Sequence, residues 1–196
     1  MSEERYQQRQ QHLKEQVETR VAEATKTGGI IIVFTGNGKG KSTAAFGSAA
    51  RAIGHDKQVG VVQFIKGTWE SGEYNLLSRN GVEFHIMKTG FTWETQDKVA
   101  DTLAAQRVWE QGRRMLSDPS YHLVILDELT YMITYGYLAL DEIITTLKER
   151  PKNQSVIITG RACHRDLIAL ADTVSELRPV KHAFDCGVKA QKGIDW

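Results

Sequence analysis

The sequence predicts an α/β fold with a mostly parallel, open sheet and helices on both of its faces. Apolar runs at residues 30–34 and 121–126 lack the alternation of apolar and polar residues expected of a strand with one solvated face. Segments of helical character separate these runs along the chain. Strands that alternate with helices are typical of a parallel sheet that is covered on both sides.

Composition limits the class of protein. The 196 residues carry 25 Lys and Arg against 24 Asp and Glu, so a single main domain without nucleic-acid or membrane partners is expected. Cys163 and Cys186 form neither a disulfide framework nor a zinc spacing, which indicates a reducing, cytoplasmic setting. The sequence shows no signal peptide and no apolar run of about 18 residues.

Residues 1–28 differ from the rest because they are rich in Gln, Glu, Lys and Arg. Apolar residues fall near one face of a helix at Tyr6, Leu13, Val17, Val21 and Ala24. Three interpretations stay open: a surface helix that docks through a thin stripe, a lid over a site, or a dimer arm. Gly28 and Gly29 end this segment, and residues 29–196 form the second predicted unit.

A glycine-rich turn follows the strand at 30–34, and a helix is expected at 43–53. Strand, glycine-rich loop, Lys-Ser and helix are the pattern of the phosphate-binding loop in P-loop nucleotide-binding proteins of RecA-like architecture. Backbone amides and the helix N-terminus attract phosphate, a lysine reaches its oxygens and a hydroxyl binds the metal. The predicted ATP-binding residues of the loop are Gly36, Asn37, Gly38, Lys39, Gly40, Lys41, Ser42 and Thr43. Three residues, not four, separate Gly36 from the Gly-Lys pair, so the loop is one residue short or begins at Thr35.

Further elements follow in order. Strands are expected at 57–65, 82–87, 121–126, 155–159 and 173–180, and helices at 73–79, 95–116, 140–149 and 163–171. Residues 181–196 have little helical or strand character and are expected to fold onto the body as a tail.

Two strand ends carry candidate ligands. Asp127 and Glu128 follow the strand at 121–126, where carboxylates hold Mg²⁺ directly or through water in nucleotide sites. Glu128 is either the closer ligand or a polarising group, with Asp127 behind it. Arg161 follows the strand at 155–159, and ligands bind at the carboxyl ends of strands in such sheets. Arg161 is therefore a candidate for phosphate binding, with an ordinary surface arginine as the alternative.

The residues alone leave the reaction open, because a phosphate loop does not decide which bond breaks. An ATPase or nucleotide switch with a DNA partner and a small-molecule phosphotransferase are alternatives. No kinase catalytic-loop signature occurs, and no side chain stands out as the base for a hydroxyl nucleophile.

Several motifs together carry a resemblance. They are GNGKGKS at 36–42, VGVVQFIKG at 59–67, GFTWET at 90–95, LDELTYM at 126–132, ITGRACHRDL at 158–167 and the segment 171–196. With these motifs the chain resembles the P-loop ATP:corrinoid adenosyltransferases of bacteria over nearly its whole length. The short phosphate loop is part of the resemblance, whereas Ala162 stands where glycine is expected and Ser42 where threonine is common.

The resemblance implies that Co(I) of a reduced corrinoid, such as cobalamin, attacks C5′ of ATP and that triphosphate leaves. It implies Mg²⁺ or Mn²⁺ held by Ser42, Glu128 and Asp127, with Lys41 and Glu128 in catalytic roles. Phe91 and Trp93 are candidates for removing the lower ligand of cobalt, with ordinary core packing as the alternative. A flavoprotein reductant such as flavodoxin and a homodimer, with the N-terminal helix as its arm, are also implied.

Overall fold

The computed structural model describes residues 2–65, 71–87 and 97–196. Its sheet has six strands in the order β3-β2-β4-β5-β1-β6, and all neighbouring strands are parallel. The strands are β1 (Ile31–Thr35), β2 (Val59–Gln63), β3 (Glu83–Ile86), β4 (Leu123–Asp127), β5 (Ser155–Thr159) and β6 (Thr173–Glu176). The predicted parallel α/β fold is confirmed.

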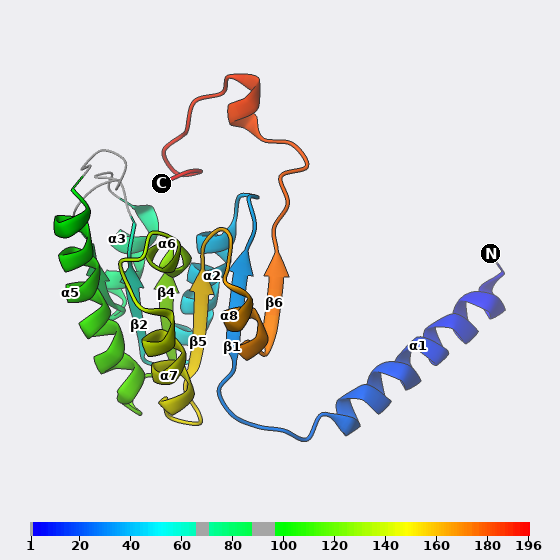
Figure 1. The fold of residues 1–196 in the computed structure, drawn as a ribbon. Helices are drawn as coiled ribbons and strands as arrows, with labels where there is room; N and C mark the ends of the chain where they lie inside the picture. Colours follow the sequence, from blue (N-terminus) through cyan, green and yellow to red (C-terminus); the bar gives the residue numbers. More distant parts are fainter. Residues whose placement is uncertain (1, 66–70, 88–96) are drawn as a thin grey trace.

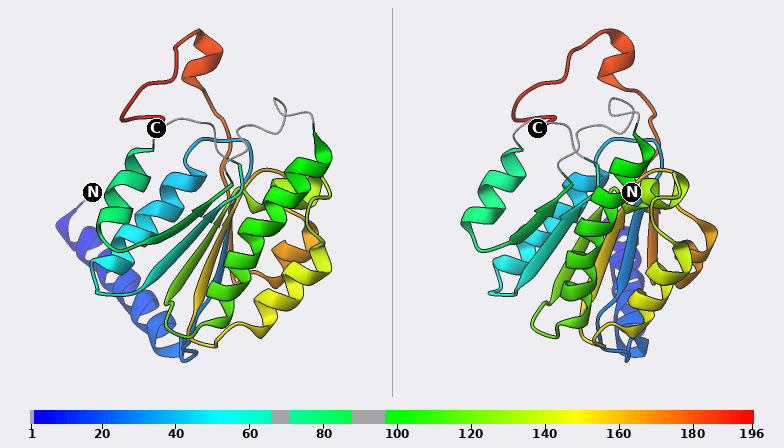
Figure 2. Two further views of the ribbon diagram at one scale, coloured as in Figure 1. Left: turned by 90° about the vertical axis from the view of Figure 1, so that its left-hand side faces the viewer. Right: turned by 60° about the vertical axis from the view of Figure 1, so that its left-hand side comes forward.

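Helices cover the sheet on both faces (Figure 2). The helices are α1 (Glu3–Glu23), α2 (Lys41–Ile53), α3 (Gly72–Arg79), α5 (Lys98–Ser117), α6 (Leu129–Thr134), α7 (Leu140–Glu149) and α8 (Arg165–Leu170), with a 3₁₀ turn η1 (Ala183–Cys186). Alternate residues of β1 face opposite sides: Ile31 and Val33 belong to the core beneath α5 to α8, whereas Ile32 and Phe34 pack against the core beneath α2 and α3. Burial on both faces explains why the strands read as continuous apolar runs.

Some predicted boundaries are wrong for identifiable reasons. The helix after the phosphate loop begins at Lys41, because Gly40 adopts a left-handed conformation (φ +113°) and serves as its N-cap. β6 ends at Glu176 instead of 180 because Leu177 turns toward the phosphate loop and Pro179 follows it. α8 starts at Arg165, where the ring of His164 caps the helix. The helix α6 and the turn η1 were not predicted.

Helix α1 extends away from the body of the molecule (Figure 1). None of its residues is buried, and four apolar side chains of its stripe are between 51% and 68% exposed: Tyr6, Leu13, Val17 and Val21. The interpretation of a helix docked on its own domain is therefore wrong for this structure, while the lid and the dimer arm stay predictions. Within the described residues, no helix is both long and apolar enough to cross a membrane.

Candidate active site

The phosphate loop, residues 36–40, connects β1 to α2 at the carboxyl edge of the sheet. Gly36 has a φ of +95°, and a Cβ atom there would lie 2.4 Å from the carbonyl oxygen of Leu177. The Gly38 amide donates a hydrogen bond of 2.7 Å to that same oxygen, and the Leu177 amide donates one of 2.8 Å to Thr35. The chain leaving β6 therefore supports the loop from behind, and only glycine fits at Gly36.

Lys41 lies in the first turn of α2 and is 8% exposed. Its Nζ donates a hydrogen bond of 2.8 Å to the Gly38 carbonyl, across the loop. Burial lowers the pKa of Lys41, while attraction to Glu128 opposes this and repulsion by Arg161 adds to it. The ammonium group of Lys41 is thus close enough to Glu128 and Arg161, both predicted as ligands, to interact with their charges.

Asp127 ends β4 and is buried, with both carboxylate oxygens occupied by neighbours. Thr159 Oγ1 donates to Asp127 Oδ1 at 2.7 Å, and Gln63 Nε2 donates to Oδ2 at 3.0 Å. The strand order places β4 between β2 and β5, which is why these donors come from both sides. Donors of the protein itself therefore occupy both carboxylate oxygens of Asp127.

Glu128 is the carboxylate that is left available. Its backbone is left-handed (φ +60°), and its amide donates to Thr159 Oγ1 at 2.9 Å. Its buried Oε2 has no hydrogen-bond partner among the described residues. Burial, followed by repulsion from Asp127, raises the pKa of Glu128 to about 7. A strained backbone and an unsatisfied buried oxygen are the properties of a group held for a ligand.

Arg161 follows β5 on a segment with restricted backbone. Gly160 has a φ of +140°, and a Cβ atom there would lie 2.0 Å from Thr130 Oγ1, which donates at 2.6 Å to the Arg161 carbonyl. Ala162 is left-handed (φ +48°), where glycine would be free of strain. The exposed guanidinium of Arg161 is close enough to lower the pKa of Lys41, so it belongs to the same charged cluster.

The remaining predicted ligands divide into two groups. Ser42 is half-buried in the first turn of α2, and Asn37, Lys39 and Thr43 are exposed on or beside the loop. Phe91 and Trp93 lie outside the described residues. The binding roles of all these residues stay predictions.

Sequence reasoning missed the groups that orient Asp127 and Glu128. Thr159 and Gln63 are buried polar residues at the carboxyl ends of β5 and β2. The signal was available, since each is the polar residue that ends an apolar strand. What the sequence lacked was the strand order that brings both to Asp127.

The donor set fits a small, hard divalent cation. Mg²⁺ prefers oxygen ligands and is usually bound by one or two carboxylates together with substrate phosphates. Glu128 Oε2 and Gln63 Oε1 are both buried and without a hydrogen bond inside the described chain, and Ser42 adds a hydroxyl in the first turn of α2. The described residues contain no cluster of three or more His, Cys, Asp or Glu side chains suited to a metal, so phosphate oxygens would have to complete the coordination.

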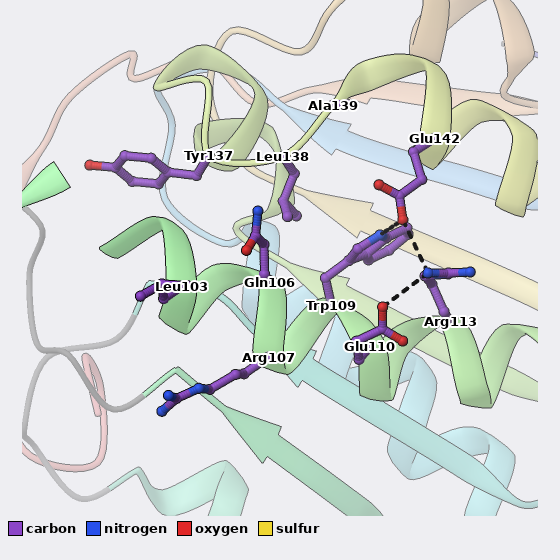
Figure 3. A pocket seen from close by; sticks show the side chains of 10 residues that line it. All are labelled: Leu103, Gln106, Arg107, Trp109, Glu110, Arg113, Tyr137, Leu138, Ala139 and Glu142. Carbon is purple, nitrogen blue, oxygen red and sulfur yellow. Dashed lines mark hydrogen bonds and ion pairs between the residues drawn. The ribbon is translucent and has the colours of Figure 1, made fainter. Parts of the chain in front are cut away.

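A groove of about 510 Å³ lies elsewhere, between α5 and the segment before α7 (Figure 3). Several of its polar groups are paired with one another: Arg113 contacts Glu110 at 2.9 Å and Glu142 at 3.4 Å, and Trp109 Nε1 donates to Glu142 at 2.9 Å. The two contacts to Glu142 join α5 to α7, so we interpret the groove as part of the helix packing.

The family description "ATP:corrinoid adenosyltransferase BtuR/CobO/CobP" matches residues 27–196. This chain belongs to the ATP:corrinoid adenosyltransferase family. Among curated proteins, this adenosyltransferase is 68% identical to corrinoid adenosyltransferase CobA of Salmonella typhimurium, over the full length of both chains. It is 45% identical to the corrinoid adenosyltransferase of Pseudomonas aeruginosa, covering 98% of this chain and 96% of that protein.

Among solved structures, the adenosyltransferase resembles the flagellar accessory protein FlaH of Methanocaldococcus jannaschii. The TM-score is 0.51 at 12% identity, covering 76% of this chain and 71% of FlaH. Such a likeness concerns the fold alone. It agrees with the parallel α/β fold that the sequence predicted.

Proposed function

We propose that the phosphate loop, Lys41 and Glu128 serve the transfer of the 5′-deoxyadenosyl group of ATP to Co(I) of a reduced corrinoid. The electron pair of Co(I) forms the bond to C5′, the C5′–O bond breaks, and triphosphate leaves with the bonding electrons. The product is an adenosylated corrinoid, either adenosylcobalamin or a precursor. The observation that carries this proposal is the family match, which spans the phosphate loop and both strand ends of the site.

The chemistry fits the site, because a Co(I) nucleophile already holds its electron pair and needs no general base. Negative charge develops on the triphosphate as it departs. Lys41 and the loop amides are placed to stabilise this charge. The protein's main task is therefore to bind the leaving group and to present C5′ outward to the corrin.

A divalent cation, Mg²⁺ or Mn²⁺, would be held by Ser42 and Glu128, with Asp127 orienting the site from behind. When bound, it supplies positive charge to the triphosphate oxygens. The free Oε2 of Glu128 supports this assignment, and the two hydrogen bonds to Asp127 support its indirect role.

Two aromatic residues are proposed to act on the corrinoid. Phe91 and Trp93 would exclude the lower ligand of cobalt and so favour four-coordinate Co(II), which is easier to reduce. The electron would come from a flavoprotein such as flavodoxin, which would share the reducing cytoplasm with this chain. Conversion of Phe91 and Trp93 to alanine should then abolish turnover from Co(II) corrinoid while sparing turnover from chemically prepared Co(I).

Helix α1 is proposed as a lid exchanged across a homodimer. Its exposed apolar stripe and its distance from the body of its own chain support this role (Figure 1). Deletion of residues 2–24 should weaken corrinoid binding and leave ATP binding intact. Unchanged corrinoid affinity after the deletion would exclude the lid.

The central test separates adenosyl transfer from ATP hydrolysis by product. The chain is incubated with ATP, Mg²⁺ and chemically reduced Co(I) cobalamin in dim light, with Lys41→Met as the matched inactive variant. A light-sensitive alkyl-cobalt spectrum with an equal amount of triphosphate is expected. Steady release of orthophosphate without a spectral change would instead identify an ATPase and overturn the proposal.

A further inference from the structure

The last 20 residues form an arch over the phosphate loop. This C-terminal arch (residues 177–196) leaves β6, passes above the carboxyl edge of the sheet and turns back toward the middle of that edge (Figures 1 and 2). It contacts the loop at both of its ends. Leu177 is bonded through its backbone to Gly38 and Thr35, and Asp195 is bonded through its side chain to Lys39.

Lys39 in the phosphate loop and Lys41 at the start of α2 both donate hydrogen bonds to acceptors of the protein itself. Lys39 Nζ lies 2.5 Å from Asp195 Oδ1, and Lys41 Nζ donates to the Gly38 carbonyl at 2.8 Å. Ammonium groups in such loops bind phosphate oxygens through charge-assisted hydrogen bonds. A triphosphate that engages both lysines therefore competes with both internal acceptors for the ammonium groups, and only one of these acceptors, the Asp195 carboxylate, is itself an anion.

Asp195 is held in position by its own turn. Its Oδ2 accepts a 2.7 Å hydrogen bond from the Gln191 amide, while the amides of Ile194 and Asp195 donate to the Gln191 carbonyl. The hydrogen bond from Lys39, followed by that from the Gln191 amide, lowers the pKa of Asp195, so the carboxylate stays ionised at neutral pH. A fixed, ionised carboxylate on the loop lysine is a local substitute for a phosphate oxygen.

We infer that Asp195 is an internal counter-anion that competes with triphosphate for Lys39 and thereby promotes release of the leaving group. This inference rests on the proposed function, since it assigns a role to Asp195 in the step that frees the loop of product. A product with several negative charges binds a phosphate loop tightly, and an internal competitor lowers that affinity without touching C5′ or cobalt. Asp195 acts through Lys39 and is thus a positioning residue.

A purely structural role for Asp195 predicts the opposite change in triphosphate affinity when Asp195 is removed. If Asp195 merely anchors the arch so that the loop keeps its shape, its removal would weaken triphosphate binding. If it competes for Lys39, its removal would strengthen triphosphate binding. The ion pair is half-exposed, with side-chain exposures of 48% for Lys39 and 26% for Asp195, so the expected change is about two- to fivefold.

The test is calorimetric titration of the full chain with inorganic triphosphate and Mg²⁺. Asp195→Asn should lower the Kd about two- to fivefold, whereas Asp185→Asn, which removes the same charge from an exposed position in the arch, should leave it unchanged. In a Lys39→Gln background, Asp195→Asn should have no effect, because the lysine for which it competes is gone.

The other outcomes of this titration count against either the inference or the proposed function. An unchanged or higher Kd for Asp195→Asn, or an effect that persists in the Lys39→Gln background, would overturn the inference. Failure of the unmodified chain to bind triphosphate at all would instead count against the proposed function. Steady-state inhibition by triphosphate provides a second readout, in which Asp195→Asn should be inhibited at lower triphosphate concentration.

Discussion

Replacing Glu128 by glutamine should stabilise the metal-free protein at alkaline pH. The carboxylate is buried beside Asp127, and its pKa of about 7 in the folded chain compares with an ordinary value of 4.5. At about 1.36 kcal/mol for each unit of pKa, the difference corresponds to about 3 kcal/mol. This figure already includes the attraction of Lys41, which opposes the rise.

The sign follows from the protonation states. Because folding raises the pKa, the folded chain is favoured while Glu128 is protonated, and this advantage is lost as the pH rises from about 4.5 through about 7. Glutamine resembles the protonated form and does not titrate. The variant and the unmodified chain should therefore have similar stability near pH 4.5, and the variant should be more stable by about 3 kcal/mol near pH 8.5.

The assay is urea unfolding at several pH values, with EDTA present and nucleotide absent. Glu149→Gln, which changes an exposed carboxylate on α7, is the control and should alter stability by less than about 0.5 kcal/mol at every pH. The reasoning would be refuted if the difference in the free energy of unfolding between Glu128→Gln and the unmodified chain did not grow with pH. The same variant should lose adenosyl transfer, since the proposed metal ligand is gone.

Further predictions concern four single positions. Thr159→Val removes the hydroxyl that donates to Asp127 at 2.7 Å, so unfolding in urea should show a loss of about 2–3 kcal/mol; a loss below 0.5 kcal/mol would contradict the role given to this hydroxyl. Gly38→Ala should weaken ATP binding about tenfold or more in a titration, because the added Cβ would lie 2.7 Å from the carbonyl carbon of Leu177. At Gly47 an added Cβ would meet no described atom within 4 Å. Gly47→Ala should therefore stabilise α2 by about 0.5–1 kcal/mol and keep ATP affinity unchanged. Burial raises the pKa of Cys163 to about 11, so its thiol should react with an aromatic disulfide reagent at pH 8 at least about tenfold more slowly than free cysteine, and equal rates would show that it is accessible.

The sequence by itself determined the fold class and was enough to name the main residues of the candidate site. Continuous apolar strands, the glycine-rich loop and the acids after β4 are local signals, because each depends on residues that are adjacent in the chain. Helix α7 and strand β5 were predicted at their observed bounds for the same reason. Family membership also came from local motifs, which together span most of the chain.

Only the tertiary structure decided how the two acids differ. Asp127 and Glu128 are neighbours in sequence, yet strand order gives Asp127 donors from both sides, while one oxygen of Glu128 has no hydrogen-bond partner in the described part of the chain. The same holds for Lys39, whose partner Asp195 lies 156 residues further along the chain. Such pairings depend on how strands are ordered and how the chain end returns, and sequence spacing alone does not encode either in a readable pattern.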